Sequence, residues 1–202
     1  MTNLKVNIAG VSFKNPVITA SGCFGFGREY ECMYPLEKLG GISLKGMTFQ
    51  EKLGNPPPRI AETPSGMLNS VGLQNPGVEH FLEHDMPYLA KQDTVKIANI
   101  AGSSIEDYCA IAERLSESEI DMFELNISCP NVKQGGAAFG TSCESAERVV
   151  KEVRKYAKKP MIVKLSPNVT DIVSIAKAVE AQGADAVSLI NTLLGMRIDI
   201  NT

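Results

Sequence analysis

The sequence lacks the features that mark a membrane or secreted protein. No run of apolar residues approaches the ~20 that are needed to cross a bilayer. No basic segment followed by an apolar one stands at its start, as a signal peptide would require. The net charge is only -3 over 202 residues, so there is no basic excess for nucleic acid or anionic lipid. We therefore expect a cytoplasmic protein that binds neither membranes nor nucleic acid.

Patterns for disulfides and metals are also scarce. The five cysteines are an odd number and include no C-x-x-C pair, which favours reduced thiols over a disulfide framework or a zinc site. The two histidines, His80 and His84, are four residues apart on a predicted helix, a spacing that can bind metal. No glutamate follows the first histidine and no third ligand is evident, so we expect no metal site.

The sequence does contain a regular alternation of short apolar segments and helical segments. A β-hairpin is predicted at 4–13, followed by strands at 16–20, 41–45, 94–99, 121–125, 161–164 and 186–190. Helices are predicted within 29–39 and at 78–90, 104–116, 145–157 and 170–182, with a long loop at 46–77. The strands lack strict alternation of apolar and polar residues, which is typical of a parallel sheet covered by helices.

A polar residue ends or directly follows each of these six strands. They are Ser21, Lys45, Asn99, Asn126, Lys164 and Asn191. A doubly wound sheet fits the order of elements almost as well, but a (β/α)8 TIM barrel gathers the carboxyl ends of its strands into one active site. We predict an α/β fold, a TIM barrel with about six βα units present. Because such a barrel needs ~250 residues, we expect 1–202 to be a single barrel domain, incomplete at its C-terminal end.

The segment 124–131 joins a strand to a polar turn, in which Asn126 and Asn131 bracket Ser128 and Cys129. Pro130 disfavours helical geometry at Cys129 and removes one amide donor beside the sulfur. A partly ionised thiol among hydrogen-bonding amides can act as a general base. The alternative is a buried structural cysteine, and we favour the functional interpretation.

Lys45 and Lys164 each end a short apolar strand, where a lysine is costly to bury unless an anion or polar ring meets it. A cation beside the pyrimidine edge of a flavin would stabilise its anionic reduced form. A Schiff-base lysine is a competing function, and extension of the amine to solvent is the alternative without function.

Glycine-rich segments complete the candidate site. The stretch 69–75 offers amides and backbone groups for a carboxylate or imide, although its composition also fits an ordinary turn. Gly22, Gly25 and Gly27 lack the third glycine of a dinucleotide fingerprint, because Tyr30 stands there. We expect them to let the backbone approach a flat ring. The pair at 135–136 could hinge a lid over the site, and plain loop flexibility explains it about as well.

Six motifs together resemble the dihydroorotate dehydrogenase family. They are Ala-Ser-Gly at 20–22, Ser-Leu-Lys-Gly at 43–46, Asn-Ser-Val-Gly-Leu at 69–73, Asn-Ile-Ser-Cys-Pro-Asn at 126–131, Val-Lys-Leu at 163–165 and Asn-Thr at 191–192. Cysteine rather than serine at 129 is similar to the class 1 enzymes. The stretch 22–30 is similar to the NAD-dependent 1B catalytic subunit, and the fumarate-using 1A type and related pyrimidine-reducing flavoproteins remain alternatives.

The resemblance implies roles for individual residues. Cys129 would be the base that takes a proton from dihydroorotate, and FMN would accept the hydride. The residues implied to bind substrate are Lys45, Asn69, Ser70, Val71, Gly72, Leu73, Asn126, Asn131, Asn191 and Thr192. The residues implied to bind FMN are Ser21, Lys45, Gly46, Asn99, Asn126, Lys164 and Ile190.

The resemblance also implies partners. A 1B catalytic subunit passes electrons to NAD through a second subunit that carries FAD and a [2Fe-2S] cluster, within a heterotetramer built on a homodimer. Family members continue through two more strands with glycine-rich turns that hold the FMN phosphate. A truncated, non-catalytic chain is therefore a further alternative.

Overall fold

A parallel sheet of six strands forms the centre of the molecule. The computed structural model describes residues 2–128, 138–198 and 200. The order of the strands is β10-β9-β8-β7-β4-β3, and all neighbouring pairs are parallel. Their bounds are Ile18–Thr19 for β3, Gly41–Ser43 for β4, Val95–Ile100 for β7, Met122–Asn126 for β8, Met161–Lys164 for β9 and Ala186–Ser188 for β10. The predicted parallel α/β architecture is confirmed as a barrel-like half-sheet with helical crossovers.

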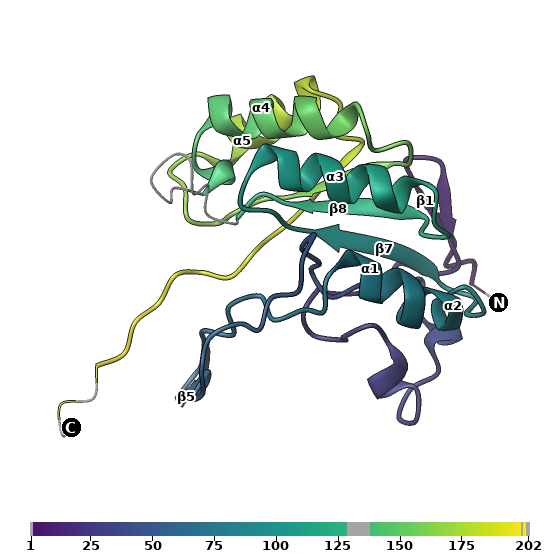
Figure 1. The fold of residues 1–202 in the computed structure, drawn as a ribbon, viewed down its shortest axis with the longest axis horizontal. Coiled ribbons are helices and arrows are strands. Elements are labelled where there is room, and N and C mark those ends of the chain that lie inside the picture. Colours follow the sequence, from purple (N-terminus) through teal and green to yellow (C-terminus); the bar gives the residue numbers. More distant parts are fainter. Residues whose placement is uncertain (1, 129–137, 199, 201–202) are drawn as a thin grey trace.

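Helices cover one face of this sheet. They are α1 (Val78–His80), which continues through the π-helical turn Phe81–Asp85 into α2 (Met86–Leu89), then α3 (Ile105–Ser116), α4 (Cys143–Arg154) and α5 (Ile172–Ala181). Alternate strand residues such as Phe123 and Leu125 join buried helix residues in the main apolar core. Figure 1 shows α3, α4 and α5 gathered on one side of β7 and β8. The predicted capping box at Ser104 is present, and its hydroxyl accepts the backbone N–H of Asp107.

The N-terminal hairpin closes one end of the opposite, inner face. Strands β1 (Val6–Ile8) and β2 (Val11–Phe13) are antiparallel, and their turn places Ala9 and Gly10 at positive φ. The side chain at the end of β2 packs on three residues of the sheet. We call this group the apolar floor: Phe13, Ile97, Met122 and Ile162.

Two sequence predictions of local structure were wrong. In place of a helix within 29–39 there are two short 3₁₀ turns, Arg28–Tyr30 and Leu36–Lys38. Pro35 lies between them with extended geometry (ψ 127°) and no amide donor, so a helix cannot continue through it. The predicted loop 46–77 contains an antiparallel hairpin of β5 (Ile60–Thr63) and β6 (Gly66–Asn69). Its residues are largely exposed and therefore lack a clear apolar pattern.

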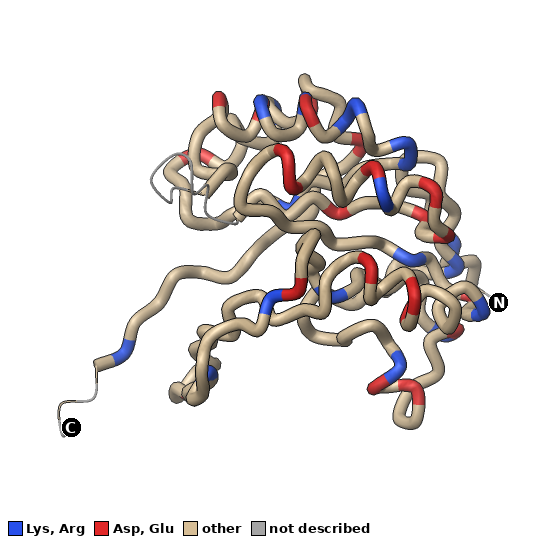
Figure 2. The backbone as a smooth tube through the Cα atoms, in the orientation of Figure 1, with Lys and Arg blue, Asp and Glu red and all other residues tan. Residues whose placement is uncertain are grey.

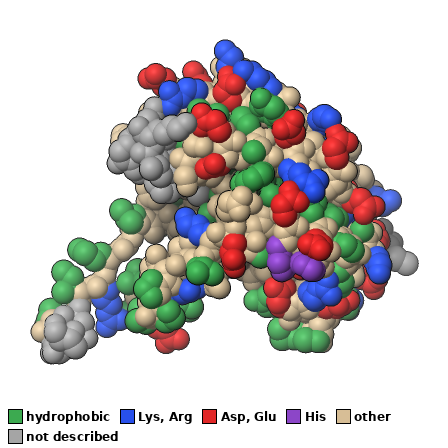
Figure 3. Space-filling view, viewed as in Figure 1, with side chains coloured by type: hydrophobic (Ala, Val, Ile, Leu, Met, Phe, Trp, Pro, Cys, Tyr) green, Lys and Arg blue, Asp and Glu red, His purple; other side chains and the backbone are tan. Residues whose placement is uncertain are grey.

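The chain after β10 runs outward to the side where this hairpin lies (Figure 1). The guanidinium of Arg197 donates to the backbone oxygen of Glu62 at 3.0 Å. Several apolar side chains of the segment are at the surface, as Figure 3 shows; they are Leu193, Leu194, Met196, Ile198 and Ile200. This segment and the hairpin both approach the carboxyl ends of the strands.

Charged residues of both signs are spread along the helices and loops of the backbone (Figure 2). This distribution agrees with the small net charge of -3. In the part of the chain that the structure describes, no helix is long and apolar enough to cross a lipid bilayer.

Candidate functional site

The inner face of the sheet becomes polar toward the carboxyl ends of the strands. Residues two apart on a strand point to the same face, so Asn99 follows Ile97 and Glu124 follows Met122 on this face. Four of these side chains are joined by hydrogen bonds, and we call them the polar layer: Ser43, Asn99, Glu124 and Ser188. The polar layer lies directly beyond the apolar floor, where the predicted site begins.

Asn99 is buried, with 1% of its surface exposed. Its amide nitrogen donates to Glu124 at 2.6 Å, whereas its oxygen is buried with no hydrogen-bond partner among the described residues. A Cβ atom at Gly46 would lie 2.8 Å from that oxygen and 3.1 Å from Leu73 Cδ1. Glycine at 46 therefore keeps space open in front of an unpaired acceptor, an arrangement that suits a flat ring with an N–H group.

Asn126 lies at the end of β8 and connects several parts of the site. Its side-chain oxygen accepts from Asn191 Nδ2 at 2.9 Å and from the backbone N–H of Ser128 at 3.2 Å. The hydroxyl of Tyr108 donates to the backbone oxygen of Asn126 at 2.6 Å. These bonds fix the end of β8 and bring Asn126 together with Asn191, which follows β10, although β9 lies between the two strands.

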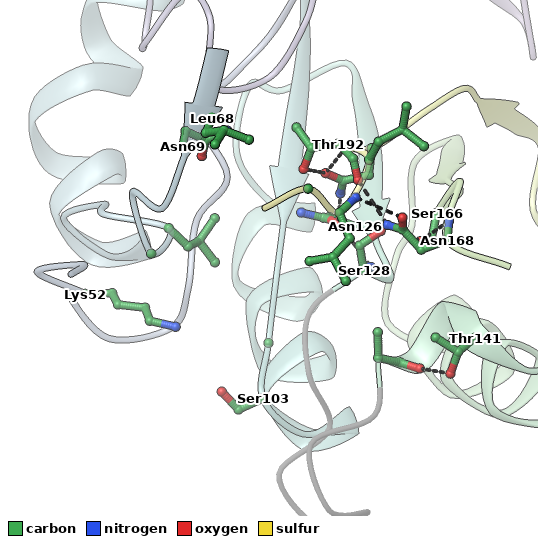
Figure 4. Close-up of a pocket in the computed structure, with 18 of the residues that line it drawn as sticks. Lys52, Leu68, Asn69, Ser103, Asn126, Ser128, Thr141, Ser166, Asn168 and Thr192 are labelled. Atoms are coloured by element: carbon green, nitrogen blue, oxygen red, sulfur yellow. Dashed lines mark hydrogen bonds between the residues drawn. The ribbon is translucent and has the colours of Figure 1, made fainter. Parts of the chain in front are cut away.

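A cavity of about 750 Å³ opens over these strand ends. In Figure 4, Lys52 and Asn69 lie on one side of it, and Asn126, Ser166 and Thr192 lie opposite. Most of its remaining lining comes from three places: the β5–β6 hairpin and the turn after it, the loop ends around Ser103 and Thr141, and the segment 191–195. Amides that both donate and accept surround this space, so it can hold a small polar ring or a carboxylate.

A second set of hydrogen bonds holds the segment 192–194 against the loop that follows β9. Asn168 Nδ2 donates to the backbone oxygen of Thr192 at 3.0 Å, and Asn168 Oδ1 accepts the N–H of Leu194 at 3.0 Å. The backbone N–H of Asn168 in turn donates to Ser166 Oγ at 3.2 Å. The wall that contains Thr192 is thus fixed by residues that the sequence analysis did not single out.

The predicted stretch 69–73 divides between two roles. Asn69, Gly72 and Leu73 line the cavity. Ser70 and Val71 instead form backbone hydrogen bonds with the chain that precedes β5. The N–H of Ser70 donates to the backbone oxygen of Arg59 at 2.8 Å, and the N–H of Asn55 donates to the backbone oxygen of Val71 at 3.1 Å. Gly72 has a φ of 75°, and a Cβ there would lie 2.7 Å from a backbone nitrogen, so only glycine fits this turn.

Lys45 lines an adjoining cavity of about 330 Å³ rather than the larger one. Lys52 lines both cavities, which places them side by side. Burial lowers the pKa of the Lys45 ammonium, and the nearby thiol of Cys23 partly offsets that shift. A lysine that is partly stripped of water at this position is suited to meet an anionic group.

The other predicted cofactor residues lie at or near strand ends. Ser21 Oγ donates to the backbone oxygen of Leu44 at 2.7 Å, which ties the end of β3 to the residue before Lys45. Lys164 ends β9 in register with Asn126 and Ser188. Ile190 follows β10 and is 46% exposed. Cys129, Asn131 and the glycines at 135–136 lie outside the described residues.

Sequence reasoning missed Glu124, Ser43 and Ser188. Glu124 lies inside β8, and Ser43 and Ser188 end β4 and β10 two residues before the predicted strand ends, so none was noticed as a strand-end residue. The available signal was a carboxylate within the strand Met122–Asn126, which is hard to bury without donors. Across residues 2–128, 138–198 and 200, no group of three or more His, Cys, Asp or Glu side chains is placed to hold a metal ion.

Comparison with known proteins gives a consistent result. The family model for dihydroorotate dehydrogenase matches residues 3–202. The chain is 61% identical over 199 residues to a protein of Alkaliphilus metalliredigens named "Dihydroorotate dehydrogenase B (NAD(+)), catalytic subunit", covering 98% of this chain and 66% of that protein. A protein of the same name from Listeria welshimeri is 58% identical over 203 residues, covering 100% and 67%. The chain thus spans about two thirds of the length of these curated relatives.

Proposed function

Because the chain belongs to the dihydroorotate dehydrogenase family, we propose that it carries out the flavin-dependent oxidation of dihydroorotate to orotate in de novo pyrimidine biosynthesis. The observation that carries the proposal is the cavity at the carboxyl ends of the strands, where the amides of Asn69, Asn126 and Asn191 line one space. A carboxylated ring with two N–H groups and two carbonyls needs such groups, since amides both donate and accept.

FMN, when bound, supplies the hydride acceptor. The residues proposed to hold it are Ser21, Lys45, Gly46, Asn99, Asn126, Lys164 and Ile190. The unpaired buried oxygen of Asn99, with Gly46 keeping the space before it open, fits the N–H edge of a flavin ring. A positive charge on Lys164 or Lys45 would stabilise negative charge that develops on that ring.

We propose that the substrate is held by Lys45, by residues 69–73, and by Asn126, Asn131, Asn191 and Thr192. The hydrogen bond of 2.9 Å from Asn191 Nδ2 to the Asn126 side-chain oxygen holds these two amides side by side at the strand ends. Cys129 would act as the general base that removes the C5 proton. A thiol can do so near neutral pH when neighbouring positive charge or hydrogen-bond donors stabilise the thiolate.

The name of these relatives, which describes an NAD(+)-linked "B" type and a "catalytic subunit", supports a proposal about partners. We propose that electrons reach NAD through a second subunit carrying FAD and a [2Fe-2S] cluster, in an assembly built on a homodimer. The five scattered cysteines of this chain favour reduced thiols, in keeping with a cytoplasmic location.

Replacement of Cys129 tests the assignment of the base. In the full-length gene product, Cys129→Ala should retain bound flavin yet lose nearly all flavin reduction by dihydroorotate, followed by stopped-flow absorbance. Cys109→Ala, on α3 and away from the cavity, is the matched control and should react as wild type. Wild-type rates in Cys129→Ala would end the assignment.

Two further measurements separate the alternatives. Reoxidation of the reduced protein by fumarate without any partner subunit would favour the 1A type, whereas dependence on a partner and NAD supports the proposal. Absence of yellow flavin absorbance after purification, together with failure to bind added FMN, would instead support a non-catalytic chain.

A further inference from the structure

Glu124 is a buried carboxylate that the proposed reaction does not use. It is 6% exposed and lies on the inner face of β8. Three donors from three other strands reach it: Ser43 Oγ of β4 and Asn99 Nδ2 of β7, each 2.6 Å from Oε2, and Ser188 Oγ of β10, 2.8 Å from Oε1. A buried carboxylate costs several kcal/mol unless such donors satisfy it, so its presence calls for a reason.

The carboxylate determines which way the neighbouring amide points. An ionised carboxylate only accepts hydrogen bonds, so Asn99 must turn its NH₂ group toward Glu124. The reverse orientation would place two acceptor oxygens 2.6 Å apart. The amide oxygen of Asn99 consequently faces the other way, toward the space that Gly46 leaves open.

That oxygen is buried and has no hydrogen-bond partner among the described residues. An unsatisfied buried acceptor costs about 1–3 kcal/mol. A bound ring with an N–H donor would recover that cost, and the imide N–H of a flavin is such a donor. A ring edge that offered only carbonyl oxygens would meet repulsion at this position.

We propose that Glu124 is a positioning residue that fixes the Asn99 amide so that its oxygen accepts the flavin N–H. This inference rests on the proposed function, because it takes FMN as the bound ring. Glu124 acts only through Asn99 and does not itself contact the ring. Its two serine donors hold the carboxylate in place from both sides of β8.

The test is a double-mutant cycle on FMN affinity in the full-length gene product. Glu124→Gln preserves shape, but the new side chain can offer an NH₂ group of its own, so the Asn99 amide can flip. The expected result is an FMN dissociation constant about tenfold higher, equivalent to one hydrogen bond, measured by flavin fluorescence. In an Asn99→Ala background the same substitution should change the constant less than about twofold, because the residue it positions is gone.

A purely structural role gives a different result. Glu124→Gln would then weaken FMN binding equally with and without Asn99, or not at all, and either outcome overturns the inference. Ser188→Ala is the matched control, since it removes one donor to Glu124 but leaves the Asn99 contact, and it should affect FMN binding less than Glu124→Gln. Failure of the wild-type protein to bind FMN would count against the proposed function instead.

A second measurement needs no folded variant at position 124. In isotope-labelled wild-type protein, the side-chain NH₂ of Asn99 should exchange its hydrogens slowly, because it is buried against the carboxylate. The NH₂ of the exposed Asn3 is the internal reference. Exchange at Asn99 as fast as at Asn3 would overturn the proposed orientation.

Discussion

The two ends of the inner sheet face differ in what they contribute. The apolar floor packs Phe13 on Ile97, Met122 and Ile162, whereas the polar layer begins only two residues further along the same strands. Burial of the floor contributes stability through the transfer of apolar surface from water. The polar layer costs free energy unless its hydrogen bonds are complete, and one of its oxygens is left without a partner in the described residues. Stability and the proposed ligand binding thus fall at different ends of each strand, as in barrels whose active site is at the carboxyl end.

The largest effect is expected from removing the centre of the floor. Phe13 is fully buried, and a Cβ at Gly41 would lie 2.9 Å from its ring, so the glycine makes room for it. Phe13→Ala should lower the free energy of unfolding by about 3–5 kcal/mol, measured by urea denaturation of the full-length gene product. FMN affinity of the folded fraction should stay near the wild-type value.

The exposed Phe49, 38% accessible, is the matched control for Phe13. Phe49→Ala should cost less than about 1 kcal/mol. If Phe13→Ala destabilises no more than Phe49→Ala, the floor does not carry the stability assigned to it. If Phe13→Ala abolishes FMN binding in folded protein, stability and cofactor binding are not divided between the two ends of the inner face.

Replacement of Lys45, beside the polar layer, is expected to stabilise the protein, in contrast to replacement of Phe13, and by a smaller amount. Burial lowers the pKa of this lysine in the folded protein, so the unfolded chain holds the proton more tightly. The destabilisation is fully present at neutral pH and disappears as the pH rises through the lowered pKa toward the unfolded value of about 10.4. Lys45→Met should therefore raise the melting temperature of the flavin-free protein at pH 7, and the gain should shrink in alkaline solution.

Lys52→Met is the control for that experiment, because Lys52 lines the same cavity but is exposed. It should produce no comparable rise in melting temperature. A destabilised Lys45→Met at neutral pH would show that the lysine is held by favourable contacts rather than tolerated for ligand binding.

The contrast between the two ends also explains what the sequence could reveal. Strand-end residues such as Asn126 and Asn191 were predictable, because βα periodicity alone places the carboxyl ends of parallel strands at one edge. The capping box at Ser104 is a local motif and was equally predictable. Glu124 was not, since its donors Ser43 and Ser188 are 81 and 64 residues away in the chain. Only the register and curvature of the sheet bring them together.

Errors in the prediction have the same origin. The helix expected within 29–39 is interrupted at Pro35, which has extended geometry and no amide donor. The β5–β6 hairpin was missed because its strands are mostly exposed, so no apolar pattern marks them. Elements that bury a face on the core were predictable, whereas those that shape the mouth of the site were not.

The smallest effect is expected outside both layers, at the ion pair between α1 and α3. Arg114 binds Glu79 through two hydrogen bonds of 2.6 and 2.9 Å, which lower the pKa of that carboxyl, but both side chains are more than half exposed. Water and salt screen such pairs, and holding two long side chains in place costs entropy.

Arg114→Ala should leave the melting temperature at pH 7 within the error of the measurement, and any difference from wild type should fall as salt is added. The ion pair contributes stability only while Glu79 is ionised, so its contribution disappears as the pH falls through the lowered pKa of that carboxyl. The melting temperatures of wild type and variant should therefore also converge in acid. A loss as large as that of Phe13→Ala would mean that the helix layer, rather than the floor, governs stability.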